Sequence, residues 1–286
     1  MTLASRELTI QFQLNDGTSF DGSGNNTYTA SGLRAAATIE RVGTGGLDTA
    51  IIRVFGLPPS VMAQLSTLGK RLYSSRNNIV TVQAGVEGGT LATVYIGVIQ
   101  SAYLDGAGMP DVPLMLQTST TALVASRTIP PSSFRGPVDV ATVIAGLATQ
   151  AQAAFQNFGV TAQAPATYLS GSAWTQAKRL ADTTHTELII DKETWVIWPK
   201  GTARGGQIPL ISPTTGLVGY PAFTSGGLLL TTLFNPEIAF GGQIEVQSSL
   251  RNATGTWDVF NMSHQLESQT YGGAWFTTIE CLSKKD

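Results

Sequence analysis

Short segments with strictly alternating apolar and polar side chains recur along this 286-residue chain, separated by turns rich in glycine, proline and asparagine. Residues 7–14 are the clearest case, because Leu8, Ile10, Phe12 and Leu14 alternate with polar side chains. A period of two places the apolar side chains on one face of a strand, which can cover a core. The same pattern predicts strands over 33–40, 50–55, 79–84, 94–103, 112–116, 188–190, 195–198, 228–234, 243–247 and 256–266. We therefore expect a mainly β fold of antiparallel strands.

Three helices are expected between these strands. Residues 60–68 form the first, because Pro58-Pro59 opens it, apolar side chains follow at helical spacing, and Gly69 ends it. Apolar residues at helical spacing predict the second over 138–155.

Polar residues mark the ends of the two helices in the middle of the chain. Asp139 lies in the first turn of the second helix, where the helix dipole favours an anion, and Gly159 follows its end. Ser172 is a suitable N-cap for the third helix, which runs to about Asp182. These signals place both helices in one compact part of the chain.

A change of composition divides the chain after the stretch Arg127-Thr128-Ile129-Pro130-Pro131, which has the character of a linker. We expect a β-domain with one short helix over residues 1–127, a small α+β insert over 128–203, and a second β-domain over 204–286. In the insert, Asp191-Lys192-Glu193 joins two strands as a tight hairpin.

The chain carries few charges. Charged residues make up 13% of it, against roughly 25% in typical soluble domains. A surface this poor in charge is expected to be covered by partners, which favours a component of a larger assembly. The net charge of −2 and the lack of a Lys/Arg run argue against specific nucleic-acid binding.

Cysteine and histidine are too scarce for structural cross-links. Cys281 is the single cysteine, so no internal disulfide is possible, and two histidines do not complete a structural zinc site. The first residues show no secretory signal, and no apolar run is long enough to span a bilayer as a helix. We therefore expect folding in a reducing cytoplasm, without membrane insertion, metal or cofactor.

Two histidines, His185 and His264, are the candidate catalytic bases. A serine or cysteine nucleophile needs a base within hydrogen-bonding reach and a third group that orients the base. Neither histidine has a nucleophile elbow near it in the sequence. We interpret both as structural residues.

Three carboxylates gather in the insert, at Glu187, Asp191 and Glu193. Glycosidase chemistry requires two opposed carboxyl groups with separated pKa values. Asp191 and Glu193 occupy a hairpin turn, where charge normally serves solubility. We therefore favour a role in solubility over a catalytic pair.

The glycine-rich stretches 43–46 and 85–89 lack the strand-to-helix context and the lysine of a phosphate-binding loop, which predicts hairpin turns. Trp195 and Trp198 are candidates for stacking on a sugar, but their spacing puts them on opposite faces of one strand. We expect one in the core and one at an interface. No catalytic, cofactor-binding or metal-binding residue is therefore predicted.

Several segments resemble the central baseplate hub proteins of tailed bacteriophages, especially contractile-tailed ones. The segments are Ile52–Leu57 with the helix after it, Glu87–Gly89 before Val94–Ile99, Leu217–Pro221, Phe234–Pro236, Gly255–Trp257, Ser263-His264 and Gly272–Phe276. The resemblance covers most of the chain, and its motifs are architectural.

The resemblance implies two tail-tube-like antiparallel β-barrel or sandwich domains that flank the insert. Three copies would then form a pseudo-sixfold ring, a homotrimer located in the virion tail baseplate and assembled in the host cytoplasm. The implied partners are the tail tube protein, the tape-measure protein, the central spike and other baseplate proteins. The implied role is structural and non-enzymatic.

General physics is consistent with such a ring. Two β-domains of low charge risk uncontrolled strand pairing unless their edges are occupied, and ring closure occupies them. A channel wall of low charge would let DNA slide, because it offers few phosphate contacts.

Two other classes of protein stay open on the sequence. A hub-associated peptidoglycan hydrolase would act through Glu187 or Glu193. An outer-membrane barrel would account for alternating strands and few charges, but the missing signal and the helical insert argue against it.

Overall fold

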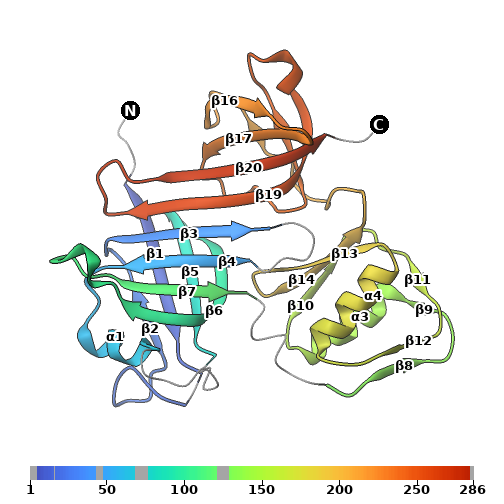
Figure 1. Ribbon diagram of the computed structural model, residues 1–286, viewed down its shortest axis with the longest axis horizontal. Coiled ribbons are helices and arrows are strands. Elements are labelled where there is room, and N and C mark those ends of the chain that lie inside the picture. Colours follow the sequence, from blue (N-terminus) through green and yellow to red (C-terminus); the bar gives the residue numbers. More distant parts are fainter. Residues whose placement is uncertain (1–4, 16, 43–47, 68–76, 121–128, 284–286) are drawn as a thin grey trace.

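The computed structural model describes residues 5–15, 17–42, 48–67, 77–120 and 129–283. We call residues 5–120 the first β-region, 129–203 the insert and 204–283 the second β-region (Figure 1). The sequence features that lie outside the described residues are the glycine-rich stretch 43–46, Leu68, Gly69 and the first two linker residues, 127–128.

Among the residues that the structure describes, seven strands form the first β-region, and buried and exposed side chains alternate along β3 and β4 as predicted. The strands are β1 (Arg6–Gln13), β2 (Thr27–Ala30), β3 (Ala35–Arg41), β4 (Thr49–Val54), β5 (Ile79–Val86), β6 (Ala92–Leu104) and β7 (Leu114–Ser119). β7 begins two residues later than predicted, just after Pro113, because proline cannot donate a ladder hydrogen bond.

Two short helical segments belong to the same region. α1 (Pro59–Leu65) confirms the first predicted helix but ends earlier than the predicted Leu68, because Ser66 is its C-cap and is extended. It buries Val61 and Leu65 against the strands. η1 (Gly106–Gly108) is a 3-10 turn in the β6–β7 connection, capped by the Asp105 side chain, which accepts from the Ala107 N–H.

The insert packs two helices against a small sheet. α3 (Val140–Gln150) and α4 (Ala173–Thr183) are accompanied by β8 (Ser132–Phe134), β9 (Val138–Asp139), β10 (Ala154–Asn157), β11 (Gln163–Ala164), β12 (Thr167–Leu169), β13 (Thr186–Asp191) and β14 (Thr194–Pro199). Ser172 caps α4 as predicted, accepting from the Thr175 N–H.

The second predicted helix is shorter than expected. It ends at Gln150, Gln152 adopts a left-handed φ of 59°, and β10 follows in place of helix. β10 pairs in parallel with β14, a long-range contact that helical spacing does not reveal. Asp139 is the N-cap of α3, not a first-turn residue, and accepts from the Thr142 N–H at 2.8 Å.

Six strands form the second β-region. They are β15 (Leu210–Ile211), β16 (Leu217–Phe223), β17 (Gly227–Leu233), β18 (Gln243–Val246), β19 (Gly255–Ser268) and β20 (Trp275–Ser283), with the 3-10 turn η2 (Arg251–Ala253) before β19. The predicted strands over 228–234, 243–247 and 256–266 are confirmed as β17, β18 and β19.

Both β-regions belong to one 13-stranded sheet, with a main strand order of β16-β17-β20-β19-β3-β4-β7-β6-β5-β1-β2. The seam is the antiparallel pairing of β19 with β3, in which Met262 to Ser268 lie opposite Arg41 to Ala35 (Figure 1). The mainly β prediction is confirmed, but the sheet is not a closed barrel: in the described part of the chain its main path ends at β2 and β16, and β18 with β15 branches from β19.

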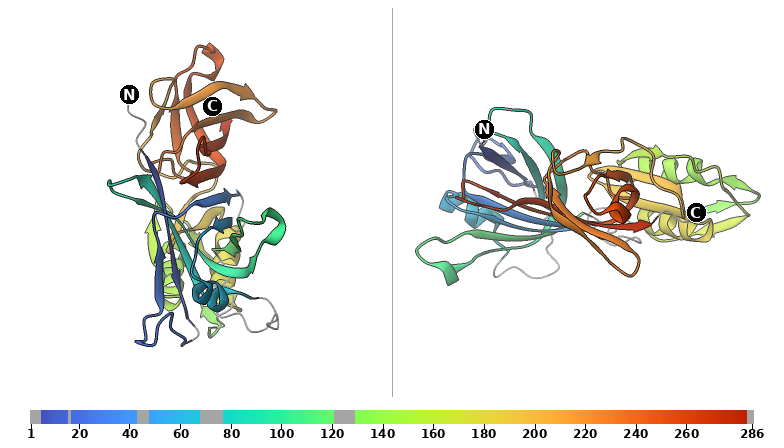
Figure 2. Two further views of the ribbon diagram at one scale, coloured as in Figure 1. Left: turned by 90° about the vertical axis from the view of Figure 1, so that its left-hand side faces the viewer. Right: turned by 90° about the horizontal axis from the view of Figure 1, so that it is seen from above.

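Three apolar cores support this arrangement. The first fills the first β-region and includes Leu266 and Trp275 from β19 and β20. The second lies inside the insert, which extends to one side of the β-regions (Figure 2). The third fills the second β-region and takes in Val196 and Trp198 from the insert. The domain boundaries after residues 127 and 203 stay a prediction.

Candidate functional site

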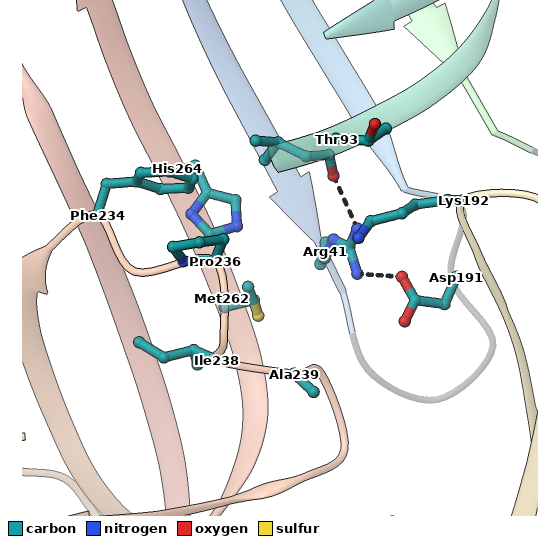
Figure 3. A pocket seen from close by; sticks show the side chains of 11 residues that line it. Arg41, Thr93, Asp191, Lys192, Phe234, Pro236, Ile238, Ala239, Met262 and His264 are labelled. Atoms are coloured by element: carbon teal, nitrogen blue, oxygen red, sulfur yellow. Dashed lines mark hydrogen bonds and ion pairs between the residues drawn. The ribbon is translucent and has the colours of Figure 1, made fainter. Parts of the chain in front are cut away.

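A buried group of charged side chains lies where the two β-regions and the insert meet (Figure 3). Arg41 is its centre, at the end of β3, and its side chain is only 6% exposed. It shares the inward face of the strand with Ala35, Ala37 and Ile39. A charged residue on a buried face needs partners, because an unpaired buried charge is costly.

The Arg41 guanidinium contacts three acceptors. Nη1 donates to Asp191 Oδ1 at 3.0 Å, and Nη2 donates to the Val94 carbonyl at 3.0 Å. Nε lies 3.6 Å from Asp48 Oδ2, close enough for an ion pair. Arg41 thus connects β3 with β6, with the start of β4 and with the insert.

Asp191 is shared by all three parts of the molecule. Its Oδ1 accepts from Arg41, and its Oδ2 accepts from Arg204 Nη1 at 2.8 Å. Arg204 begins the second β-region and lies over the Phe158 ring, 5.2 Å from the ring centroid. The expectation that Asp191 serves solubility is therefore wrong, since its side chain is 16% exposed and doubly ion-paired.

The two carboxylates of the group titrate differently. Burial acts to raise the pKa of Asp191, but the charges of Arg41 and Arg204 outweigh it and hold that pKa well below its usual range. Burial raises the pKa of Asp48 to about 6, and the nearby Asp191 adds to this rise while Arg41 opposes it. Asp191 is therefore the permanent anion of the group, and Asp48 is the weaker one.

A cavity of about 60 Å³ adjoins the charges and is lined by Arg41, Asp191, Lys192, Met262 and His264, among others (Figure 3). Burial, aided by the positive charges of Arg41 and Lys192, lowers the pKa of His264 to about 3, so the ring is neutral.

His264 Nδ1 forms a hydrogen bond of 2.9 Å with Thr277 Oγ1. The ring also packs edge-on against Phe234. These contacts agree with a structural role for His264.

The other candidate catalytic residues are dispersed. His185 is exposed, with a left-handed φ of 51°, next to the start of β13. Glu187 lies opposite Trp198 near that end of the hairpin, whereas Glu193 lies in the turn at the other end. Glu187 is four residues along the strand from Asp191, about 13 Å at strand geometry, beyond the roughly 5–10 Å of a glycosidase pair.

Other chemistry-bearing residues are buried. Cys281 is free and buried, and burial raises the pKa of its thiol to about 12, with Asp258 contributing.

Across the residues that the structure describes, no group of three His, Cys, Asp or Glu side chains is placed to hold a metal ion. The described helices include none long and apolar enough to cross a membrane.

Trp195 and Trp198 lie on opposite faces of β14 as predicted, and both are buried. Trp195 belongs to the core of the insert, and Trp198 packs in the core of the second β-region. The interface at Trp198 is therefore inside the chain. The predicted hairpin turn at residues 85–89 is confirmed between β5 and β6.

Sequence reasoning missed Arg41, Asp48 and Arg204 as partners of Asp191. One signal was available for Arg41, because it occupies the next alternate position after Ala35, Ala37 and Ile39 and therefore lies on the same buried face of the strand. Asp48 and Arg204 lie in connections, where no period marks the inward face.

Comparisons with known proteins bear on this architecture. Residues 8–281 match the family model described as Baseplate hub gp41. A search of the curated proteins found no match.

Solved structures of low sequence identity share the fold. The tail protein from Neisseria meningitidis MC58 aligns with a TM-score of 0.60 and 10% identity, covering 96% of each chain. The 43 kDa tail protein of prophage MuSo2 from Shewanella oneidensis aligns with a TM-score of 0.60 and 9% identity, covering 98% of this chain and 97% of that one. The c3393 protein of E. coli, a component of the type VI secretion system, aligns with a TM-score of 0.54 and 12% identity, covering 89% of this chain and 74% of that one.

Proposed function

The chain belongs to the baseplate hub gp41 family and is a structural component of a phage tail baseplate, and on that premise we propose that three copies close into a ring joining the tail tube to the central spike. The ring would be pseudo-sixfold, because each copy contributes two β-regions. Each copy is assembled in the host cytoplasm and contacts the tail tube protein, the tape-measure protein, the spike and other baseplate proteins.

The observation that carries this proposal is one solvent-facing sheet surface that crosses both β-regions. One row of cross-strand neighbours consists of Thr231, Thr278, Ser263, Glu40 and Thr49. Their side chains lie opposite the buried faces of β17, β20, β19, β3 and β4. Such a hydroxyl-rich row suits the wall of a channel for DNA, because none of its five residues carries the positive charge that would hold a phosphate.

The β16 end of the sheet supports head-to-tail closure. A contact between two different patches closes into a ring when the rotation permits. At the β16 end, Val218, Tyr220 and Phe223 are exposed to 42%, 74% and 56%. Pro221 and a register shift between Val218 and Ala222 disfavour added strand pairing there, so we assign this edge to side-chain packing with the next copy.

The hub acts by assembly and not by catalysis. The separation of Glu187 from Glu193 and the pairing of Asp191 with two arginines support this assignment. The boundaries 1–127, 128–203 and 204–286 are proposed as the domain limits, with the two β-domains as the units that the ring repeats and 128–203 as the insert between them.

The mass of the particle in solution tests the ring. Light scattering of the purified 30.1 kDa chain is expected to give about 90 kDa, and Tyr220→Asp with Phe223→Asp is expected to give monomers. Tyr168→Asp is the matched control, because the exposure of Tyr168, 66%, lies between those of Tyr220 and Phe223, and Tyr168 lies on the insert. A wild-type monomer at all concentrations, or dissociation by the control alone, would overturn the proposal.

A further inference from the structure

The insert is attached to the second β-region by apolar packing. Val196 and Trp198 of β14 are buried in the core of that region. Trp198 lies directly against Gly241, where a Cβ would come within 2.7 Å of Cζ2. A side chain at residue 241 would therefore push the tryptophan away, and its absence allows close contact.

The boundary between the insert and the first β-region is hollow by comparison. A groove of about 330 Å³ runs between them, with Ile79, Ile96 and Val98 on one side and Ala151 and Trp195 on the other. The 60 Å³ cavity at the charged group lies where this boundary meets the second β-region, which supplies Met262 and His264 to its lining. The cores of the two parts share no residue.

One contact that crosses this boundary is ionic. Arg41 of the first β-region donates to Asp191 of the insert, and Asp191 is also held by Arg204. Charge-assisted hydrogen bonds are directional, whereas apolar packing is not. Packing at Trp198 attaches the insert, and the bonds of Asp191 select one orientation.

We propose that Asp191, with Arg41 and Arg204, is a latch that fixes the orientation of the insert on the sheet. When the latch is broken, the insert pivots on the Trp198 contact and the width of the groove changes. The latch lies within one chain, so the inference goes beyond the ring and does not depend on it.

Distances within one chain test the latch. Spin labels on cysteines introduced at Gln11 and Gln150 report on the first β-region and the insert, since both positions are exposed and Cys281 is buried. Labelled chains are mixed with excess unlabelled chains, so that only pairs within a chain contribute to double electron-electron resonance.

The wild type is expected to give one narrow distance distribution. Asp191→Asn is expected to widen it at least twofold, because the carboxylate that both arginines share loses its charge. Asp111→Asn is the control. It breaks an exposed ion pair of the first β-region, in which Arg34 Nη1 lies 3.0 Å from Asp111 Oδ2.

Arg204→Gln keeps the test decisive if Asp191→Asn does not fold. It removes one of the two arginines and is expected to widen the distribution by a smaller factor. A broad wild-type distribution, or wild-type widths in a folded Asp191→Asn or Arg204→Gln chain, would overturn the latch and leave the ring proposal untouched.

Discussion

The two β-regions share one sheet but complete their cores differently. The first packs its own strands and α1 together and adds Leu266 and Trp275 at the seam. The second packs around Val196 and Trp198, which the chain supplies before that region begins. The second region therefore depends on the insert for its core, whereas the first depends on its neighbour for the seam alone. Strand pairing and core packing thus divide the molecule at different places.

The largest expected effect comes from removing the shared tryptophan. Trp198→Ala is expected to lower the free energy of unfolding by about 3–5 kcal/mol, because a large aromatic side chain leaves a cavity. Hydrogen exchange should show the loss of protection in β17 to β20. Trp195→Ala is the matched control on the opposite face of β14 and should expose amides of the insert instead. The same exchange pattern in both variants would contradict the comparison.

A substitution at the seam is expected to have a smaller effect, and to destabilise the first core instead of the second. Leu266 belongs to the second β-region by sequence, but its side chain packs in the first core, and the substitution is Leu266→Ala. It is expected to cost about 2–4 kcal/mol, measured by urea unfolding, and to increase exchange in β1, β5 and β6. Increased exchange confined to β15 to β18 would show that the seam does not complete the first core.

The smallest effect concerns the charged boundary. Asp48 has a folded-state pKa of about 6, above its ordinary 3.8, so its contribution to stability is present below pH 4 and lost as the pH rises through 6. Asp48→Asn is therefore expected to be more stable than the wild type at pH 8, by on the order of 1–3 kcal/mol.

The difference in unfolding free energy between the Asp48→Asn variant and the wild type isolates this residue. It should shrink as the pH falls from 7 to 4, in urea titrations at each pH. The contribution of Asp191 to the unfolding free energy depends on pH in the opposite direction. Because its folded-state pKa is lowered, this contribution is present at neutral pH and is lost only below about pH 4. A constant difference across this range would contradict the pKa of Asp48.

The sequence predicts the strands well, because a period of two is local and the burial of β3 and β4 follows it. It does not predict that β19 pairs with β3, since the choice of a partner strand depends on contacts over two hundred residues apart. The same limitation applies to β10. Its residues fit the helical spacing of the predicted helix, and only the pairing with β14 identifies them as a strand.

The charged group could be predicted only in part. Arg41 follows Ala35, Ala37 and Ile39 at every second position of β3, which marks it as a cation on the buried face. No local pattern identifies its partner. Asp191 has the sequence setting of a solvated turn, and only the approach of Arg41 and Arg204 makes it the centre of a junction. Polar residues in turns therefore need a tertiary structure before their roles can be assigned.

The seam between β19 and β3 also has a mechanical consequence. Seven register pairs join the two β-regions along antiparallel strands, with hydrogen bonds perpendicular to the strand direction. A force that pulls one region past the other along these strands loads all the bonds in shear at once, whereas a force across the sheet would peel them one by one. The joint between the two β-regions therefore resists sliding along the strands better than peeling across them.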